Sequence, residues 1–293
     1  MIKAKLKYTI MLLLILFMIV TIHFCARLFR YYSSVTFLEN HGFRFFYRYS
    51  VLGKLNPKFQ SVYLVGVGFD KNNTQKKYLY KLRDINYHRI FVHDAYLNSQ
   101  DIMYILSSSE LTGLEIIVSD INIISSENII IPRHLKELNI SYCNIDSSFL
   151  ERMIFPDRCE LKFINLSGNP ITSRGIEYII NHTYNTIESI SVRDTMVNCD
   201  VLNILKKCKH LTYLDLTRCD LHMCQINKLC QSLSLKELVL GGTNISDLEL
   251  IKICDILDNK GMKSVVYIDC YDESRENLIL YINDHYQYVS VNQ

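Results

Sequence analysis

The sequence predicts an α/β solenoid built from one repeated unit and preceded by a single apolar helix. A phrase recurs eight times from Tyr87 onward: an apolar residue, two free positions, an apolar residue, one free position and an apolar residue. Successive copies begin 24 to 27 residues apart. A fixed period of this length is the signature of architectures that stack similar units into one elongated core. An uncharged run of 19 residues, 8–26, predicts the additional helix near the N-terminus.

Each repeat is expected to contain a strand, a turn and a helix. The fourth and sixth positions are apolar and alternate with polar residues, as a half-buried strand requires. The remainder of each repeat has apolar residues at three- and four-residue steps, which indicates a helix, as in Val201, Leu202 and Leu205 or in Ile226, Leu229 and Cys230. The best copies begin at Leu135, Leu161, Leu211 and Leu235, and weaker ones at Tyr87, Leu111, Ile187 and Met262.

Small residues close the strand at the ninth position of the phrase. Such side chains can turn inward and meet backbone groups that are freed where the strand ends, so we expect a buried ladder between neighbouring repeats. The spacing of Ser148 with Glu151 and of Ser246 with Glu249 predicts capping boxes at two helix starts. The ladder positions hold Cys143, Asn169, Thr195, Cys219, Thr243 and Cys270.

This pattern resembles the leucine-rich-repeat superfamily over roughly residues 87–272, and in particular its cysteine-containing subtype. The stretch NPITSRGIEYI from Asn169 is similar to that subtype's turn into its helix. Ala95 and Ser119 depart from the ladder pattern in the first two repeats, which leaves their register open. The resemblance implies a curved solenoid with a parallel sheet on its concave side, convex helices, and a concave surface that usually binds proteins.

The expected domain organisation has four parts. Residues 1–30 form a signal anchor or transmembrane segment, and residues 31–86 form an aromatic and basic juxtamembrane cap that can include a degenerate first repeat. Residues 87–272 are the leucine-rich repeats, and residues 273–293 are a C-terminal cap and tail. Gly66 and Gly68 in YLVGVGF lack the context of a phosphate-binding loop and indicate a strand or a tight bend.

The apolar run is long enough to cross a membrane, because 19 helical residues span about 28 Å, close to the thickness of a hydrocarbon core. The residues from His23 to Ala26 lack the small pair that a signal peptidase requires, so an uncleaved anchor is favoured over a cleaved signal and over a buried soluble helix. Basic residues flank the run almost equally. The compact N-terminal lysines favour a cytoplasmic N-terminus and an exported solenoid, in a membrane that the sequence does not identify.

The formal net charge of +2 hides an asymmetry. Residues 1–30 contain five Lys or Arg and no acid, so the remainder is slightly acidic, which argues against a nucleic-acid partner. The segment 27–58 interleaves Phe and Tyr with Arg. Two interpretations are open for it: an interfacial segment with arginines on lipid phosphates, or a cap over the exposed end of the first repeat.

Ten cysteines raise the question of disulfides, but repeat periodicity favours small buried thiols instead. Cys219, Cys224, Cys230 and His222 have spacings that match no compact zinc site. We recognise no catalytic motif. The sequence therefore predicts a non-enzyme with no cofactor, no metal and no small-molecule substrate.

Outward positions of the strands supply the candidate interaction surface, because aromatic and arginine side chains among shorter polar ones are enriched at protein interfaces. Asn139 and Asn165 also begin glycosylation sequons, which we expect to be unused. The predicted function is a membrane-anchored protein that binds another, unidentified protein; the alternatives are a soluble intracellular substrate adaptor and a secreted effector released by signal cleavage. The predicted contact residues are Glu115, Glu137, Asn139, Tyr142, Phe163, Asn165, Arg193, Tyr213, Asp215 and Arg218.

Overall fold

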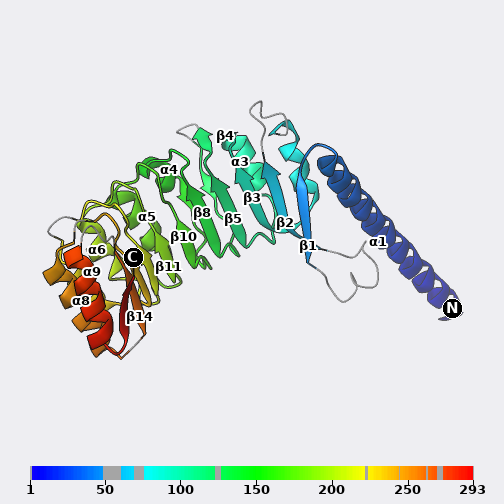
Figure 1. The fold of residues 1–293 in the computed structure, drawn as a ribbon. Coiled ribbons are helices and arrows are strands. Elements are labelled where there is room, and N and C mark those ends of the chain that lie inside the picture. The colour runs from blue at the N-terminus through cyan, green and yellow to red at the C-terminus, as the bar shows by residue number, and fades with distance from the viewer. Residues whose placement is uncertain are drawn as a thin grey trace.

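A computed structural model describes residues 2–48, 61–68, 76–122, 127–221, 224–243, 245–261, 263–268 and 273–292. The chain forms a curved solenoid whose strands stand side by side along an arc, with helices on the other side of the sheet (Figure 1). A long helix projects from the N-terminal end of the arc. This arrangement agrees with the α/β repeat fold that the sequence predicts.

The main sheet has eleven strands in the described part of the chain, in order of sequence. Its neighbouring strands are parallel throughout, except that the first two are antiparallel. The strands are β1 (Arg44–Arg48), β2 (Ser61–Gly68), β3 (Tyr87–His93), β5 (Gly113–Ile117), β8 (Glu137–Ser141), β10 (Phe163–Asn165), β11 (Ser189–Ser191), β12 (Tyr213–Asp215), β13 (Glu237–Val239), β14 (Ser264–Tyr267) and β15 (Val289–Asn292).

Helices and two short strand pairs make up the rest of the described chain. The pairs are β4 (Tyr96–Asn98) with β6 (Asp120–Asn122), and β7 (Ile129–Ile130) with β9 (Met153–Ile154). The helices are α1 (Ile2–Glu39), the 3-10 helix η2 (Lys76–Asp84), α3 (Ser99–Ile105), α4 (Ser147–Glu151), α5 (Ser173–Thr183), α6 (Asp200–Leu205), α7 (Ile226–Ser232), α8 (Asp247–Asn259) and α9 (Glu273–His285).

The expected helical segments are present, and their apolar stripes are buried. In α6, Val201 and Leu205 are fully buried, and in α7 Leu229 and Cys230 are fully buried. The repeat that begins at Leu111 differs, because its described residues form β5, β6 and β7 and no helix. The expected strand in YLVGVGF is confirmed as β2.

The fourth position of the phrase fixes the register of the sheet. Ile90 pairs with Leu114, Leu114 with Leu138, and Leu138 with Ile164, and all four are buried. A slip of one residue would turn each of these side chains to solvent. The register of the first two repeats, which the sequence left open, is therefore continuous with the others.

Each main-sheet strand from β3 to β13 is followed by a left-handed residue at the eighth position of the phrase. Most non-glycine residues avoid this conformation, so its recurrence shows that these seven repeats turn in the same way as their strands end. Glycine meets this requirement without a steric penalty at two of the copies. The residues, with φ between 50° and 69°, are Asp94, Val118, Tyr142, Gly168, Asp194, Arg218 and Gly242.

The buried ladder is confirmed at the described ninth positions, and Asn169 forms an extensive set of its hydrogen bonds. Its Oδ1 accepts from the backbone N–H groups of Cys143 and Ile145, at 2.9 and 3.2 Å. Its Nδ2 donates to the carbonyl oxygens of Ile140, Leu166 and Ser167. One amide thus satisfies backbone groups of two successive repeats.

Hydroxyls and thiols perform the same task at the other ladder positions. The Cys219 thiol donates to the carbonyl oxygen of Val192 at 3.1 Å, and the Thr243 hydroxyl donates to that of Leu240 at 2.6 Å. Ser119, outside the expected pattern, accepts from the backbone N–H of Ala95 at 3.1 Å. Cys270 lies outside the described residues.

The expected capping boxes are corrected in one case and half confirmed in the other. Asp146, not Ser148, is the N-cap of α4, and its carboxylate accepts from the backbone N–H of Phe149 at 3.0 Å. Aspartate two residues earlier is an equally good cap and leaves Ser148 free to donate to it. Ser246 does cap α8.

One disulfide corrects the interpretation that the cysteines are free thiols. Cys199 and Cys224 are bonded, with their Cα atoms 5.4 Å apart. They lie before α6 and α7, one repeat period apart, where stacking brings equivalent positions together. Six of the remaining cysteines in the described chain are free and buried, including Cys143 and Cys219, as expected.

The N-terminal helix α1 has two environments along one unbroken length. Side chains 11–22 are mostly exposed apolar groups, such as Phe17 at 70% exposure. This exposure disagrees with a helix buried in a soluble core. The last turns instead pack on the solenoid: Val35 and Leu38 are buried, and the Ser34 hydroxyl donates to Asp84 of η2 at 3.0 Å.

Candidate functional site

The predicted contact residues come together on the strand-lined concave face. Nine of the ten line one hollow of about 450 Å³ that extends from β5 to β12. The tenth, Arg218, lines a neighbouring hollow of about 440 Å³, which shares Arg193, Tyr213 and Asp215 with the first. Their grouping follows from the register, because equivalent positions of parallel strands form continuous rows across a sheet.

The row at the third position of the phrase contains two aromatic residues with a small residue between them. Phe163 pairs with Glu137 on one side and Ser189 on the other, and Ser189 pairs with Tyr213. Phe163 is 42% exposed, whereas Tyr213 is half-buried, and burial raises the pKa of its hydroxyl. The missing bulk at Ser189 leaves a recess between two aromatic rings.

Tyr142 adds a third ring from the turn after β8. A side chain on Gly168, the equivalent residue of the next repeat, would have its Cβ 2.2 Å from the Cδ1 atom of Tyr142. The ring therefore lies directly against the backbone of Gly168 while remaining 48% exposed. A large, rigid and half-exposed ring of this kind is typical of a protein-binding anchor.

Two of the predicted contacts are already paired to an arginine that sequence reasoning missed. Arg89 donates through Nη1 to Glu137 at 2.7 Å and through Nη2 to Glu115 at 3.1 Å, with a further bond from Nη2 to Glu137. Gly113 lies between them, and a Cβ there would come within 3.1 Å of the Arg89 side chain. Arg89 occupies the third position of the first clear repeat, so its place in this row could have been predicted from the register.

Asp215 is buried and its oxygens are occupied. Its Oδ1 accepts from the backbone N–H and the hydroxyl of Thr217, and its Oδ2 accepts from the Ser191 hydroxyl at 3.0 Å. Ser191 also bonds to Ser167 at 2.8 Å. Asp215 as a whole is 8% exposed, so its main contribution is to order the floor of the hollow.

Arg193 and Arg218 share one carboxylate at the C-terminal ends of their strands. Arg193 Nε lies 3.2 Å from Asp194 Oδ2, and Arg218 Nη1 lies 3.4 Å from Asp194 Oδ1. The hydrogen bond to Asp194 raises the pKa of Arg193. One acid against two arginines leaves a net positive charge at this rim.

The two asparagines of the hollow differ in whether their side-chain oxygens have a hydrogen-bond partner. Asn165 Oδ1 accepts from the backbone N–H of Ser167, whereas the buried Oδ1 of Asn139 has no hydrogen-bond partner. A buried acceptor without a partner costs free energy, so the Asn139 amide is a locally unfavourable feature among the residues that line the hollow.

The charged groups of this face are engaged: Arg89 with Glu115 and Glu137, Arg193 with Asp194, and Asp215 with hydroxyls. The described residues include no cluster of three His, Cys, Asp or Glu that could hold a metal ion. The disulfide removes Cys224 as a metal ligand. The arrangement offers shape, aromatic surface and hydrogen-bonding groups, which are properties of a binding surface.

Comparison with known families agrees with the repeat architecture. The family model described as Leucine Rich repeat matches residues 132–148, 159–179 and 207–222. Proteins of this family are typically non-catalytic. The matched segments begin just before β8, β10 and β12, three of the strands that line the hollow. No curated protein matches the chain.

Proposed function

We propose that this chain, which contains leucine-rich repeats at three positions, is a membrane-anchored protein that binds another protein through the concave face of its solenoid. The observation that carries the proposal is the convergence of Tyr142, Phe163 and Tyr213 on one hollow beside Arg193. Aromatic and arginine anchors around a recess are the usual composition of a binding hot spot. Leucine-rich repeats generally bind proteins, which supports the same conclusion.

The anchoring half of the proposal rests on α1. In the described chain, the segment Met11–Glu39 is the one helix that is long and apolar enough to cross a membrane. None of the residues in its most apolar stretch is buried. A signal sequence has the same properties, so the secreted form remains the alternative. A soluble adaptor is disfavoured, because it would expose this surface to water.

Binding is tested by placing a photo-crosslinking amino acid at Phe163 on the concave face and, as a matched control, at Tyr184 after α5. Both positions are aromatic and about equally exposed, at 42% and 40%. We expect a discrete adduct from Phe163 only, lost when Tyr142 and Tyr213 are both changed to Ala while the melting temperature changes little. Truncating a hot spot costs about 2 kcal/mol or more of binding free energy. An adduct from Tyr184 alone would place the binding surface on the convex side.

Anchoring is tested separately by carbonate extraction of membranes and mass spectrometry of the native N-terminus. We expect the full-length chain in the pellet, with residues 1–30 retained. Recovery of a soluble form that begins after Ala26 would select the secreted alternative. Protease protection of sealed membranes then determines whether the solenoid is on the exported side, as we propose.

A further inference from the structure

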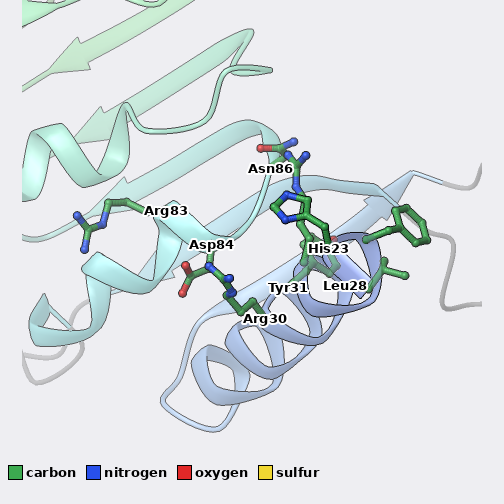
Figure 2. A pocket seen from close by; sticks show the side chains of 9 residues that line it. His23, Leu28, Arg30, Tyr31, Arg83, Asp84 and Asn86 are labelled. Atoms are coloured by element: carbon green, nitrogen blue, oxygen red, sulfur yellow. The ribbon is translucent and has the colours of Figure 1, made fainter. Parts of the chain in front are cut away.

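A second hollow, of about 490 Å³, lies where α1 meets the solenoid. One wall is the segment of α1 from His23 to Tyr31, and the other is the end of η2 and the start of β3, with Arg83, Asp84 and Asn86. Figure 2 shows His23, Arg30 and Tyr31 on the helix facing Asp84 and Asn86, while Arg83 lies apart from them. We propose that this hollow binds the phosphate of an anionic phospholipid headgroup. The proposal rests on the membrane anchoring of α1.

Charge is the first argument. Arg27 and Arg30 are both exposed, and neither forms an ion pair with any residue that the structure describes. The one carboxylate of the lining, Asp84, is engaged elsewhere: it accepts from Ser34 at 3.0 Å and lies 3.9 Å from Lys81 Nζ. Two guanidinium groups beside an occupied carboxylate favour an added anion, and their planar forks match phosphate oxygens.

Arg83 adds a third positive charge at the rim of the hollow. Its guanidinium lies over the ring of Tyr104, 5.1 Å from the ring centre, and its Nε donates to the carbonyl oxygen of Tyr80. These contacts hold its charge near the hollow without neutralising it. The lining therefore has a net positive charge even with Asp84 ionised.

Depth is the second argument. Arg27 is the first charged residue after the apolar run 8–26, so a helix that buries this run in hydrocarbon places Arg27 at the headgroup level. Arg30 is one turn further out. Phe24 and Phe29 are 57% and 75% exposed, and aromatic rings at this depth favour the interface. The positive hollow thus lies where lipid phosphates are concentrated.

The test measures phospholipid binding to the full-length chain in micelles of an uncharged detergent by native mass spectrometry. The probes are phosphatidylserine, phosphatidylcholine and inorganic phosphate. The double variant Arg27→Gln, Arg30→Gln is compared with Arg133→Gln, Arg158→Gln, which removes the same charge from exposed positions of the solenoid. We expect phosphatidylserine to bind the wild type most tightly and to bind the first variant about ten-fold more weakly, since a charged hydrogen bond contributes at least this much.

The control pair should bind phosphatidylserine as the wild type does. Equal loss in both variants would mean a general charge effect and would overturn the site. Inorganic phosphate that binds as tightly as the lipid would overturn the lipid source. Failure of the anchoring proposal is distinguishable from failure of the lipid site. If anchoring fails, carbonate extracts the wild type. If only the site fails, the wild type stays in the membrane and both variants bind lipid alike.

Discussion

Arg89 forms an ion pair with Glu137 across an entire intervening strand. The guanidinium passes over Gly113 on β5 to reach β8, and it also contacts Glu115 on the way. Side-chain exposure is 23% for Arg89, 33% for Glu115 and 37% for Glu137, so the group is partly shielded from water. One side chain thereby ties three strands of the concave face together.

We expect Glu137→Gln to destabilise the fold more than Glu115→Gln, because Arg89 makes two hydrogen bonds to Glu137 and one to Glu115. The loss should be about 1 kcal/mol for Glu137, between the values for a surface ion pair and a charged hydrogen bond. Urea unfolding at low and high salt measures both, and the difference should shrink at high salt. Equal losses of unfolding free energy would show that the second hydrogen bond to Glu137 adds no stability.

Acid should weaken the N-cap of α4. The hydrogen bond from Ser148, together with the backbone N–H of Phe149, holds the pKa of Asp146 below its usual value of 3.8. Because the folded pKa is depressed, this contribution is present above the unfolded pKa of about 3.9 and is lost as pH falls through the folded pKa. Asp146→Asn should keep the cap without the pH dependence, whereas Asp146→Ala should cost about 1 kcal/mol at neutral pH.

Urea unfolding at neutral and acid pH distinguishes these variants. The difference in unfolding free energy between the wild type and Asp146→Asn should change as the solution is acidified. If it stays constant down to the lowest pH at which the protein folds, the carboxylate has no such role.

The ladder should tolerate small polar residues better than large apolar ones. We expect Cys143→Ser to be mild and Cys143→Leu to cost about 1 to 3 kcal/mol, because added bulk must be fitted into a packed turn. Asn169→Ala should cost more than Thr243→Ala, since the asparagine leaves five bonds unmade and the threonine one. Chemical denaturation ranks the four variants, and an inverted order for either pair would contradict the ladder.

Buried thiols should resist alkylation in the folded protein. Burial raises the pKa of Cys143 and Cys219 to about 11 and of Cys208, Cys230 and Cys254 to about 12. At a pH of about 8 they remain protonated and unreactive. Iodoacetamide followed by peptide mass spectrometry should label them only after denaturation, and labelling of Cys230 in the native state would show that α7 opens.

Reduction should destabilise the protein through one bond. Cys199 and Cys224 close a loop of 25 residues, for which the chain-entropy model gives about 3.5 kcal/mol. A reductant should lower the melting temperature of the wild type but not of Cys199→Ser, Cys224→Ser. A wild type that melts identically with and without reductant, and whose peptides carry free thiols, would contradict the disulfide.

The repeat period predicted the parts of the fold that depend on stacking. It gave the strands, the ladder and the clustering of nine contact residues, because each is a property of equivalent positions in successive repeats. It did not give the N-cap at Asp146, since three candidate caps occupy neighbouring positions and local geometry chooses among them. The disulfide was missed because neither Cys199 nor Cys224 occupies a position that recurs as cysteine in other repeats.

The sequence predicted where the residues of the candidate site lie, but not which of them pair with one another. Outward positions follow from alternation, whereas the engagement of Glu115 and Glu137 by Arg89 depends on the absence of a side chain at Gly113. The carboxylate of Asp215 is engaged by one hydroxyl from its own repeat and one from the preceding repeat. Long side chains reach beyond their own strand, so sequence position alone does not identify their partners.

The unbroken α1 has a mechanical consequence for an anchored chain. Residues 27–39 continue α1 beyond its apolar run for about 18 Å and end packed on η2, and the helix has no break along this described length. A continuous helix of this kind is a stiff connection, whereas a glycine-rich linker would be a flexible one. In a chain anchored as we propose, the concave face would be held at one height and tilt relative to the lipid surface, and a partner in the same membrane would reach it only from a restricted range of directions.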